Sequence, residues 1–145
     1  MPGPPPVGTG QLMELLSVSL STYHGDFTTA AAREKLTASQ GRTLSVLRHG
    51  PAAMRVLAET LACDASNMTG IVDRLEKRSL VRREPSPGDR RVKNVVITPE
   101  GEHAIDTIRA NMHTTLAGLA TLDDKDRATL YALLDRVFTA RPADA

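Results

Sequence analysis

Apolar residues recur at the spacing of an amphipathic helix over the first half of the chain. This pattern predicts four helices, at about residues 11–35, 38–48, 54–62 and 65–78. Two of them have clear starting signals. Thr37 followed by Gln40 matches a capping box for the second helix, and Asp64 is a good N-cap for the fourth. Gly25 lies inside the first stretch, where it could bend the helix.

After the fourth predicted helix, the spacing of apolar residues changes from a helical period to the alternation that is typical of strands. Residues 80–84 and 92–98 read as two strands, and the letters PSPGDRR between them supply the proline, glycine and aspartate of a turn. In the second strand, Val95 and Ile97 face one side and Val96 the other. The middle of the chain therefore predicts a β-hairpin with two arginines at its tip.

Two further helices are expected after the hairpin. Thr98 is a suitable N-cap for the first of them, with Pro99 at the first helical position. The apolar residues expected to face inward in that helix are Ile105, Ile108, Met112, Leu116 and Leu119. The last helix begins at the letters LDDKD, and its apolar face consists of Leu130, Leu133, Leu134, Val137 and Phe138. The predicted fold is mainly α with a small β-hairpin, in the order four helices, hairpin, two helices.

Charge is distributed unevenly along the chain, although the formal net charge is only +1. Residues 42–93 hold eleven Lys and Arg against six Asp and Glu, a net charge of +5. Residues 1–41 have a net charge of −1 and residues 94–145 of −3. A basic middle with acidic flanks favours a polyanion as the partner of the middle segment.

Several classes of protein are disfavoured by what the sequence lacks. No apolar run approaches the length of a membrane span. Residues 1–9, rich in proline and glycine, predict a disordered arm rather than a signal peptide. The single Cys63 cannot form an intramolecular disulfide, which is typical of a reducing cytoplasm. The four histidines lack metal-ligand spacing and no catalytic motif is found, so no metal, cofactor or enzymatic activity is expected.

The fourth predicted helix has two contrasting faces. Met68, Ile71, Val72 and Leu75 form an apolar stripe that would be buried. The opposite face carries small and polar side chains that could enter the major groove of DNA. The residues expected to contact DNA from this helix are Ser66, Asn67, Gly70 and Arg74. Two short helices joined by the letters ACDAS and followed by a charged hairpin are the pattern of a winged helix-turn-helix.

Two of these residues have plain alternative interpretations. Gly70 costs about 1 kcal/mol relative to Ala in mid-helix, which makes sense if a larger side chain would hold the helix away from DNA. A tolerated surface glycine is the alternative. Arg74 could reach a phosphate or a base edge, or could instead pair with Asp73 or Glu76.

The hairpin tip places Arg90 and Arg91 where they can lie along the DNA backbone or in the neighbouring minor groove. Asp89 cannot bind a phosphate, and we expect it to hold Arg91 by a short ion pair. A solvated charged turn is the alternative interpretation of the tip.

The letters DRLEKRSLVRREPSPGDRR, residues 73–91, are soon followed by ITPEG, residues 97–101. Together with the rest of residues 10–140 they resemble the MarR family of bacterial transcription regulators. The Asp-x-Arg wing signature of that family falls on Asp89 and Arg91. The resemblance implies a homodimer that binds double-stranded DNA at a pseudo-palindromic operator, usually as a repressor relieved by a small ligand. That effector, often a small aromatic anion in the family, would bind in a crevice that Tyr23, His24, Arg42 and His49 could approach. Ordinary packing explains these four residues equally well.

The expected organisation is one compact domain with four regions. These are a disordered arm (1–9), an N-terminal dimerisation helix (10–36), the winged helix-turn-helix region (37–98) and C-terminal dimerisation helices (99–141). The apolar stripes of the terminal helices exceed what residues 37–98 can cover, which also predicts a dimer. The residues expected at its interface, several of them also packing within their own chain, are Leu12, Leu15, Leu16, Ile108, Met112, Leu130, Leu134 and Phe138.

The chain departs from the family pattern at two places. Ala52 and Ala53 stand where the family often has a strand residue and a Ser or Thr cap, and Ser79 replaces a common C-cap glycine.

Two other functions remain open. One is a regulator that senses oxidants through Cys63, although a small buried hydrophobe is the ordinary role of such a cysteine. The other is a winged-helix module that binds protein rather than DNA.

Overall fold

The computed structural model describes residues 2–139. Contacts along the chain divide it into two compact units, one that ends at Met112 and one that begins at His113. The first unit contains both segments that are expected to contact DNA.

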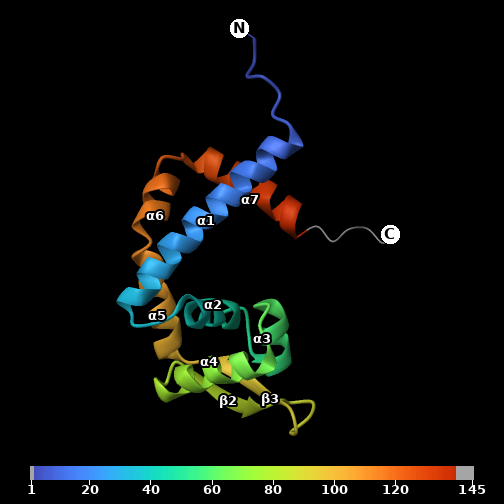
Figure 1. Cartoon of the computed structure of the whole chain (residues 1–145), viewed down its shortest axis with the longest axis vertical. Helices are drawn as coiled ribbons and strands as arrows, with labels where there is room; N and C mark the ends of the chain where they lie inside the picture. Colours follow the sequence, from blue (N-terminus) through green and yellow to red (C-terminus); the bar gives the residue numbers. More distant parts are fainter. Residues whose placement is uncertain (1, 140–145) are drawn as a thin grey trace, which may run out of the picture. The chain divides into compact units, whose positions relative to one another are not determined.

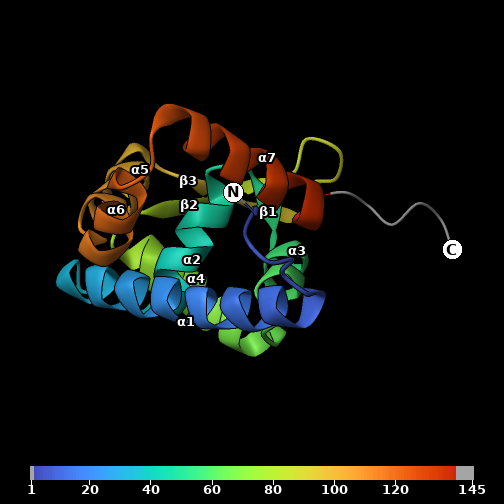
Figure 2. The same cartoon turned by 90° about the horizontal axis from the view of Figure 1, so that it is seen from above.

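Five helices belong to the first unit (Figure 1). They are α1 (Thr9–Arg33), α2 (Ala38–Leu47), α3 (Met54–Thr60), α4 (Ala65–Lys77) and α5 (Pro99–Ala110). The four helices predicted ahead of the hairpin are confirmed. Gly25 does not interrupt α1, which Figure 2 shows as one continuous helix.

The helix starts follow the capping signals in the sequence. Thr37 Oγ1 accepts a hydrogen bond from the Gln40 amide at 3.1 Å, and Gln40 Oε1 accepts one from the Thr37 amide at 3.0 Å. Asp64 Oδ1 accepts one from the Asn67 amide at 2.7 Å, at the start of α4. These side chains satisfy amide groups that the helix cannot pair internally.

The sheet has three strands, where the sequence predicts a hairpin of two. Strand β2 (Val81–Pro85) pairs antiparallel with β3 (Lys93–Ile97), as predicted. The third strand, β1 (Ala52–Ala53), pairs with the other edge of β3, giving the order β1-β3-β2. β1 was missed because two alanines show no alternation. Its existence depends on β3, which lies some forty residues further along the chain.

The core of the first unit is formed mainly by aliphatic side chains together with Phe27. The predicted stripe of α4 is confirmed, since Met68, Ile71, Val72 and Leu75 are each 4% exposed or less. Burial of one such side chain contributes about 1.5–3 kcal/mol. The orientation of α4 about its own axis is therefore strongly determined.

The sequence prediction of a single helix running from Pro99 past Leu119 is wrong. α5 ends at Ala110, and a separate helix, α6 (His113–Ala120), begins after the break. Asn111 makes the break locally favourable, because its side-chain amide donates to the Thr107 carbonyl at 2.9 Å. Met112 is buried in the core, whereas Leu116 and Leu119 on α6 are exposed.

The second unit contains α6 and α7 (Asp124–Phe138), joined by a short connection (Figure 1). Asp123 begins α7 by accepting a hydrogen bond from the Asp126 amide at 2.8 Å. The apolar side chains expected on one face of α7 are all exposed in the single chain. Residues 140 and 141, the end of the expected C-terminal region, lie outside the described residues.

The junction between α4, β2 and α5 is tightly packed. Ser79, which follows α4, has a left-handed backbone conformation, with φ of 59°, that residues other than glycine seldom adopt. Thr98 Oγ1 donates to the Ser79 carbonyl at 2.6 Å and accepts from the Gly101 amide at 3.1 Å. A Cβ atom on Gly101 would lie 2.1 Å from the Leu80 carbonyl oxygen, so only glycine fits without a backbone shift.

We predict that Gly101→Ala lowers the free energy of unfolding by about 1–3 kcal/mol, because the new methyl group must push α5 away from β2. Urea denaturation measures the change. Gly25→Ala is the matched control, since a Cβ there meets nothing within 4 Å and should raise stability by up to about 1 kcal/mol. A Gly101→Ala protein as stable as the parent would contradict the close approach.

Candidate nucleic-acid interface

The outer face of α4 carries the residues that the sequence analysis singled out. Ser66, Asn67 and Arg74 are exposed, and Gly70 is half-buried. A Cβ added to Gly70 would meet nothing within 4 Å. Packing within the chain therefore does not require glycine at this position, which leaves the approach of an external partner as an explanation for it.

The wing, defined here as residues 81–97, consists of β2, β3 and their connection. Its turn is closed by hydrogen bonds from the Ser86 amide to the Val92 carbonyl at 2.8 Å and from the Val92 amide to the Asp89 carbonyl at 3.0 Å. In Figures 1 and 2 this connection projects beyond the helices of the first unit. Arg90 and Arg91 lie on it and are exposed.

The expected ion pair between Asp89 and Arg91 is not what the structure contains. Asp89 Oδ1 instead accepts a hydrogen bond from the backbone amide of Arg91 at 3.0 Å. An aspartate two residues ahead of an amide favours this local turn over a long-range contact. Asp89 thus shapes the turn, and the Arg91 guanidinium has no acidic partner among residues 2–139.

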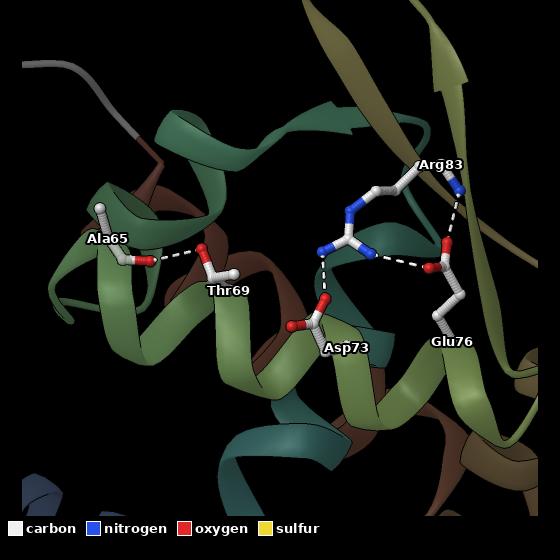
Figure 3. A network of polar contacts seen from close by, with 5 residues as sticks. All are labelled: Ala65, Thr69, Asp73, Glu76 and Arg83. Atoms are coloured by element: carbon white, nitrogen blue, oxygen red, sulfur yellow. Dashed lines mark hydrogen bonds and ion pairs between the residues drawn. The ribbon is translucent and has the colours of Figure 1, made fainter.

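An ion cluster that joins α4 to the wing was missed by the sequence analysis. From β2, the Arg83 guanidinium donates to Asp73 Oδ1 at 2.6 Å and to Glu76 Oε1 at 2.8 Å (Figure 3). Glu76 Oε2 also accepts from the Arg83 backbone amide at 3.2 Å. The hydrogen bond to Asp73, with the charge of Glu76 nearby, raises the pKa of Arg83 above its ordinary value. The alternative in which Arg74 pairs with Asp73 or Glu76 is wrong, since Arg83 takes both carboxylates.

These pairings determine which charges stay free on this surface. Arg82 pairs with Glu84 on the same strand, so the glutamates of α4 and the wing are both engaged by arginine. Within the described chain, five cations of α4 and the wing have neither a hydrogen bond nor an ion pair from their side chains. They are Arg74, Lys77, Arg90, Arg91 and Lys93. The surface is therefore positive where the polar face of α4 and the hairpin tip are exposed.

A further arginine fixes the C-terminal end of α4. Arg78 donates to the carbonyl oxygens of Lys35 at 2.9 Å and Glu34 at 3.0 Å, at the end of α1. Cations near a helix C-terminus interact favourably with its unpaired carbonyls. α4 is thus anchored to α1 as well as to the core.

A pocket of about 240 Å³ lies between α1, α2, the end of α3 and α5. Tyr23, His24 and Arg42, three of the four residues expected near an effector crevice, line it, whereas His49 does not. Phe27 and Arg109 complete its aromatic and cationic character. The Tyr23 and Phe27 rings stack with centroids 6.5 Å apart.

Other candidate chemistry is sparse in the part of the chain that the structure describes. Cys63 is half-buried at the corner between α3 and α4, against the core. No group of three His, Cys, Asp or Glu side chains among residues 2–139 could hold a metal ion. Over the same residues, no helix has both the length and the apolar character needed to cross a bilayer.

Two short helices, α3 and α4, meet at a tight corner, and a hairpin with a positive tip follows them. An exposed polar face on the second helix completes the arrangement of a winged helix-turn-helix protein. This is the class that the fold and the site define.

Known proteins place the chain within that class. The MarR family model matches residues 36–93. The HTH-type transcriptional repressor NicR of Pseudomonas putida is 32% identical over 131 residues, covering 89% of this chain and 83% of that protein. The chain belongs to the MarR family and is a transcriptional regulator.

Two solved structures support the fold at similar length. CouR from Rhodococcus jostii RHA1, bound to p-coumaroyl-CoA, is 26% identical with a TM-score of 0.68, covering 90% of this chain and 92% of that one. BpsR from Bordetella bronchiseptica, whose DNA binding is regulated by 6-hydroxynicotinic acid, is 25% identical with a TM-score of 0.66. That match covers 95% of this chain and all of the BpsR chain.

Proposed function

We propose that the protein is a homodimeric repressor that binds a pseudo-palindromic DNA operator and is released by a small ligand. The observation that carries the DNA-binding part is the set of unpaired cations around the polar face of α4. A surface that leaves positive charge without acidic partners gains most from binding phosphates, because counterions are then released.

The two segments of this surface would contribute differently. α4 is held rigidly by its buried stripe, so Ser66 and Asn67 in its first turn can form directed hydrogen bonds to base edges. The tip of the wing is held only by its own turn, so Arg90 and Arg91 would contact phosphates or the minor groove with less angular precision. We therefore assign sequence discrimination to α4 and general affinity to the tip of the wing.

A salt titration of two variants tests this assignment. Arg91→Ala should weaken binding to operator and random DNA alike, and should reduce the slope of log K against log salt by roughly one unit. Asn67→Ala should cost about 1–3 kcal/mol on the operator and little on random DNA, with the slope nearly unchanged. The operator can be obtained by selection from a random duplex pool.

The reverse result, with Asn67→Ala flattening the slope and Arg91→Ala alone erasing discrimination, would interchange the two roles. Arg55→Ala on α3 is a matched control for loss of a surface arginine, because its guanidinium already pairs with Glu59 at 2.9 Å. If neither Asn67→Ala nor Arg91→Ala changes DNA binding, the proposed interface is wrong.

The dimer is proposed from apolar side chains that the single chain leaves exposed. On α1, Leu12 and Leu15 are 49% and 63% exposed; on α7, Leu134 and Phe138 are 40% and 62% exposed. Such surfaces on a monomer mark interaction sites. Leu16, half-buried, and Leu130, 38% exposed, stay in the proposed interface. Ile108 and Met112 leave it, because they are buried in the core of their own chain, at 0% and 3% exposure.

We expect the protein to sediment as a dimer at micromolar concentration. Leu134→Glu should shift it toward the monomer, because a charge would be buried in an apolar interface. Ala132→Glu, on the opposite face of α7, is the matched control and should leave the dimer intact. A parent protein that sediments as a monomer would exclude this part of the proposal.

The pocket beside α1 and α2 supports the proposal of a small aromatic anion as effector. Stacked aromatic rings offer an apolar wall, and Arg42 and Arg109 can neutralise a carboxylate. The relatives CouR and BpsR have p-coumaroyl-CoA and 6-hydroxynicotinic acid in the descriptions of their structures. A ligand here would contact α1, α2 and α5, which support α4 through the core.

We predict that 6-hydroxynicotinate, a small aromatic anion, releases the protein from its operator in a gel-shift titration. Arg42→Met should weaken that response by about tenfold or more, since a hydrogen bond to a charged group contributes about 1.5–3 kcal/mol. His49→Ala serves as the control, because His49 does not line the pocket. An Arg42→Met protein with an unchanged response would place the effector elsewhere.

A further inference from the structure

We propose that Arg83 is a positioning residue that makes α4 and the wing meet DNA as one rigid unit, with Asp73 and Glu76 as its anchors. The inference rests on the proposed DNA-binding function and adds a residue that need not touch DNA itself. Its consequence is that a carboxylate on the DNA-facing helix strengthens sequence discrimination instead of opposing it.

The geometry joins the two elements through both side chain and backbone. Arg83 directs separate guanidinium nitrogens at Asp73 and Glu76, which lie one turn apart on α4 (Figure 3). A planar guanidinium fixes the directions of its donors, so two bonds from it restrict rotation as well as distance. The third bond, from the Arg83 amide to Glu76 Oε2 at 3.2 Å, fixes the main chain of β2.

The position of β2 explains why such a tie is needed. In the order β1-β3-β2, β2 is an edge strand, and among residues 2–139 only β3 pairs with it. The outer amide of Arg83 would otherwise be unpaired on that edge, and Glu76 satisfies it. The other ion pair of the strand, Arg82 with Glu84, stays within β2 and cannot join the wing to a helix. The Arg83 cluster therefore links α4 to the wing at a point where the sheet does not.

If only charge mattered, the Asp73 carboxylate would be expected to weaken DNA binding, which is the opposite of the role proposed for it. Its side chain is 52% exposed and lies on the face of α4 away from the buried stripe. A negative charge near phosphates weakens binding, so its removal should tighten binding to every DNA. If Asp73 instead holds Arg83 in place, its removal loosens the wing relative to α4. On the operator, the base contacts of α4 fix one register, so a loosened wing loses phosphate contacts there and operator binding weakens. Random DNA fixes no register, so binding to it is not weakened in this way. The sign of the effect separates the two interpretations.

The decisive variant is Asp73→Asn, which keeps the size of an exposed side chain and so should not disturb folding. We expect operator binding to weaken about three- to tenfold, while binding to random DNA stays level or tightens. Arg83→Gln should show the same loss of discrimination. Asp73→Glu, which keeps a carboxylate for Arg83, should retain part of the discrimination that Asp73→Asn loses.

Glu84→Gln is the matched control, because it removes the same charge and breaks an arginine pair, but one confined to β2. It should leave discrimination unchanged. The double variant Asp73→Asn with Arg83→Gln should lose no more than either single variant, since both remove the same link. Dissociation constants for selected and random duplexes give the discrimination of each variant. Thermal unfolding of each variant checks that it is still folded.

If Asp73→Asn tightens binding to both DNAs as a simple loss of negative charge would, or if the losses of the double variant add, the inference is overturned while the proposed function stands. A parent protein that shows no preference among duplexes would overturn both.

Discussion

Burial of the apolar stripe of α4 is the constraint on which the rest of the interface depends. Met68, Ile71, Val72 and Leu75 together contribute several kcal/mol. An exposed ion pair typically contributes 0–1 kcal/mol. The core therefore decides which way α4 faces, and surface charges can only adjust what that orientation presents. Ser66 and Asn67 are exposed because no rotation of the helix could bury them without exposing this stripe.

On that scaffold the electrostatics of the surface follow from which carboxylates are already occupied. Asp64 caps α4, Asp89 shapes the turn of the wing, and Arg83 engages the two acids of α4 that face the wing. Arg82 pairs with Glu84, and the other five cations of α4 and the wing have no acidic partner in the described residues. A near-neutral protein can thus present a positive surface at one place, because its negative charges there are used to build the structure.

The features predicted correctly from sequence are those that short-range physics determines. The capping box at Thr37, the cap at Asp64 and the stripe of α4 each depend on residues within two turns. β1 and the Arg83 cluster depend on strands and helices that meet only after folding, and the sequence has no local sign of them. The end of α5 was missed because apolar spacing continues across Asn111, whose side chain bonds to the Thr107 carbonyl where the helix ends. Asp89 was assigned the wrong partner, since a turn amide is nearer to it than a mobile guanidinium.

The central claim is that α4 and the wing form a single DNA-binding surface. Amide chemical shifts of the ¹⁵N-labelled protein, followed while a selected duplex is added, test it most directly. The account predicts that amide signals of residues 65–74 and 86–92 shift together, with the same apparent dissociation constant. The amide signals of α7 should not shift as DNA is added. Shifts confined to the second unit, or two segments that respond at clearly different DNA concentrations, would contradict it.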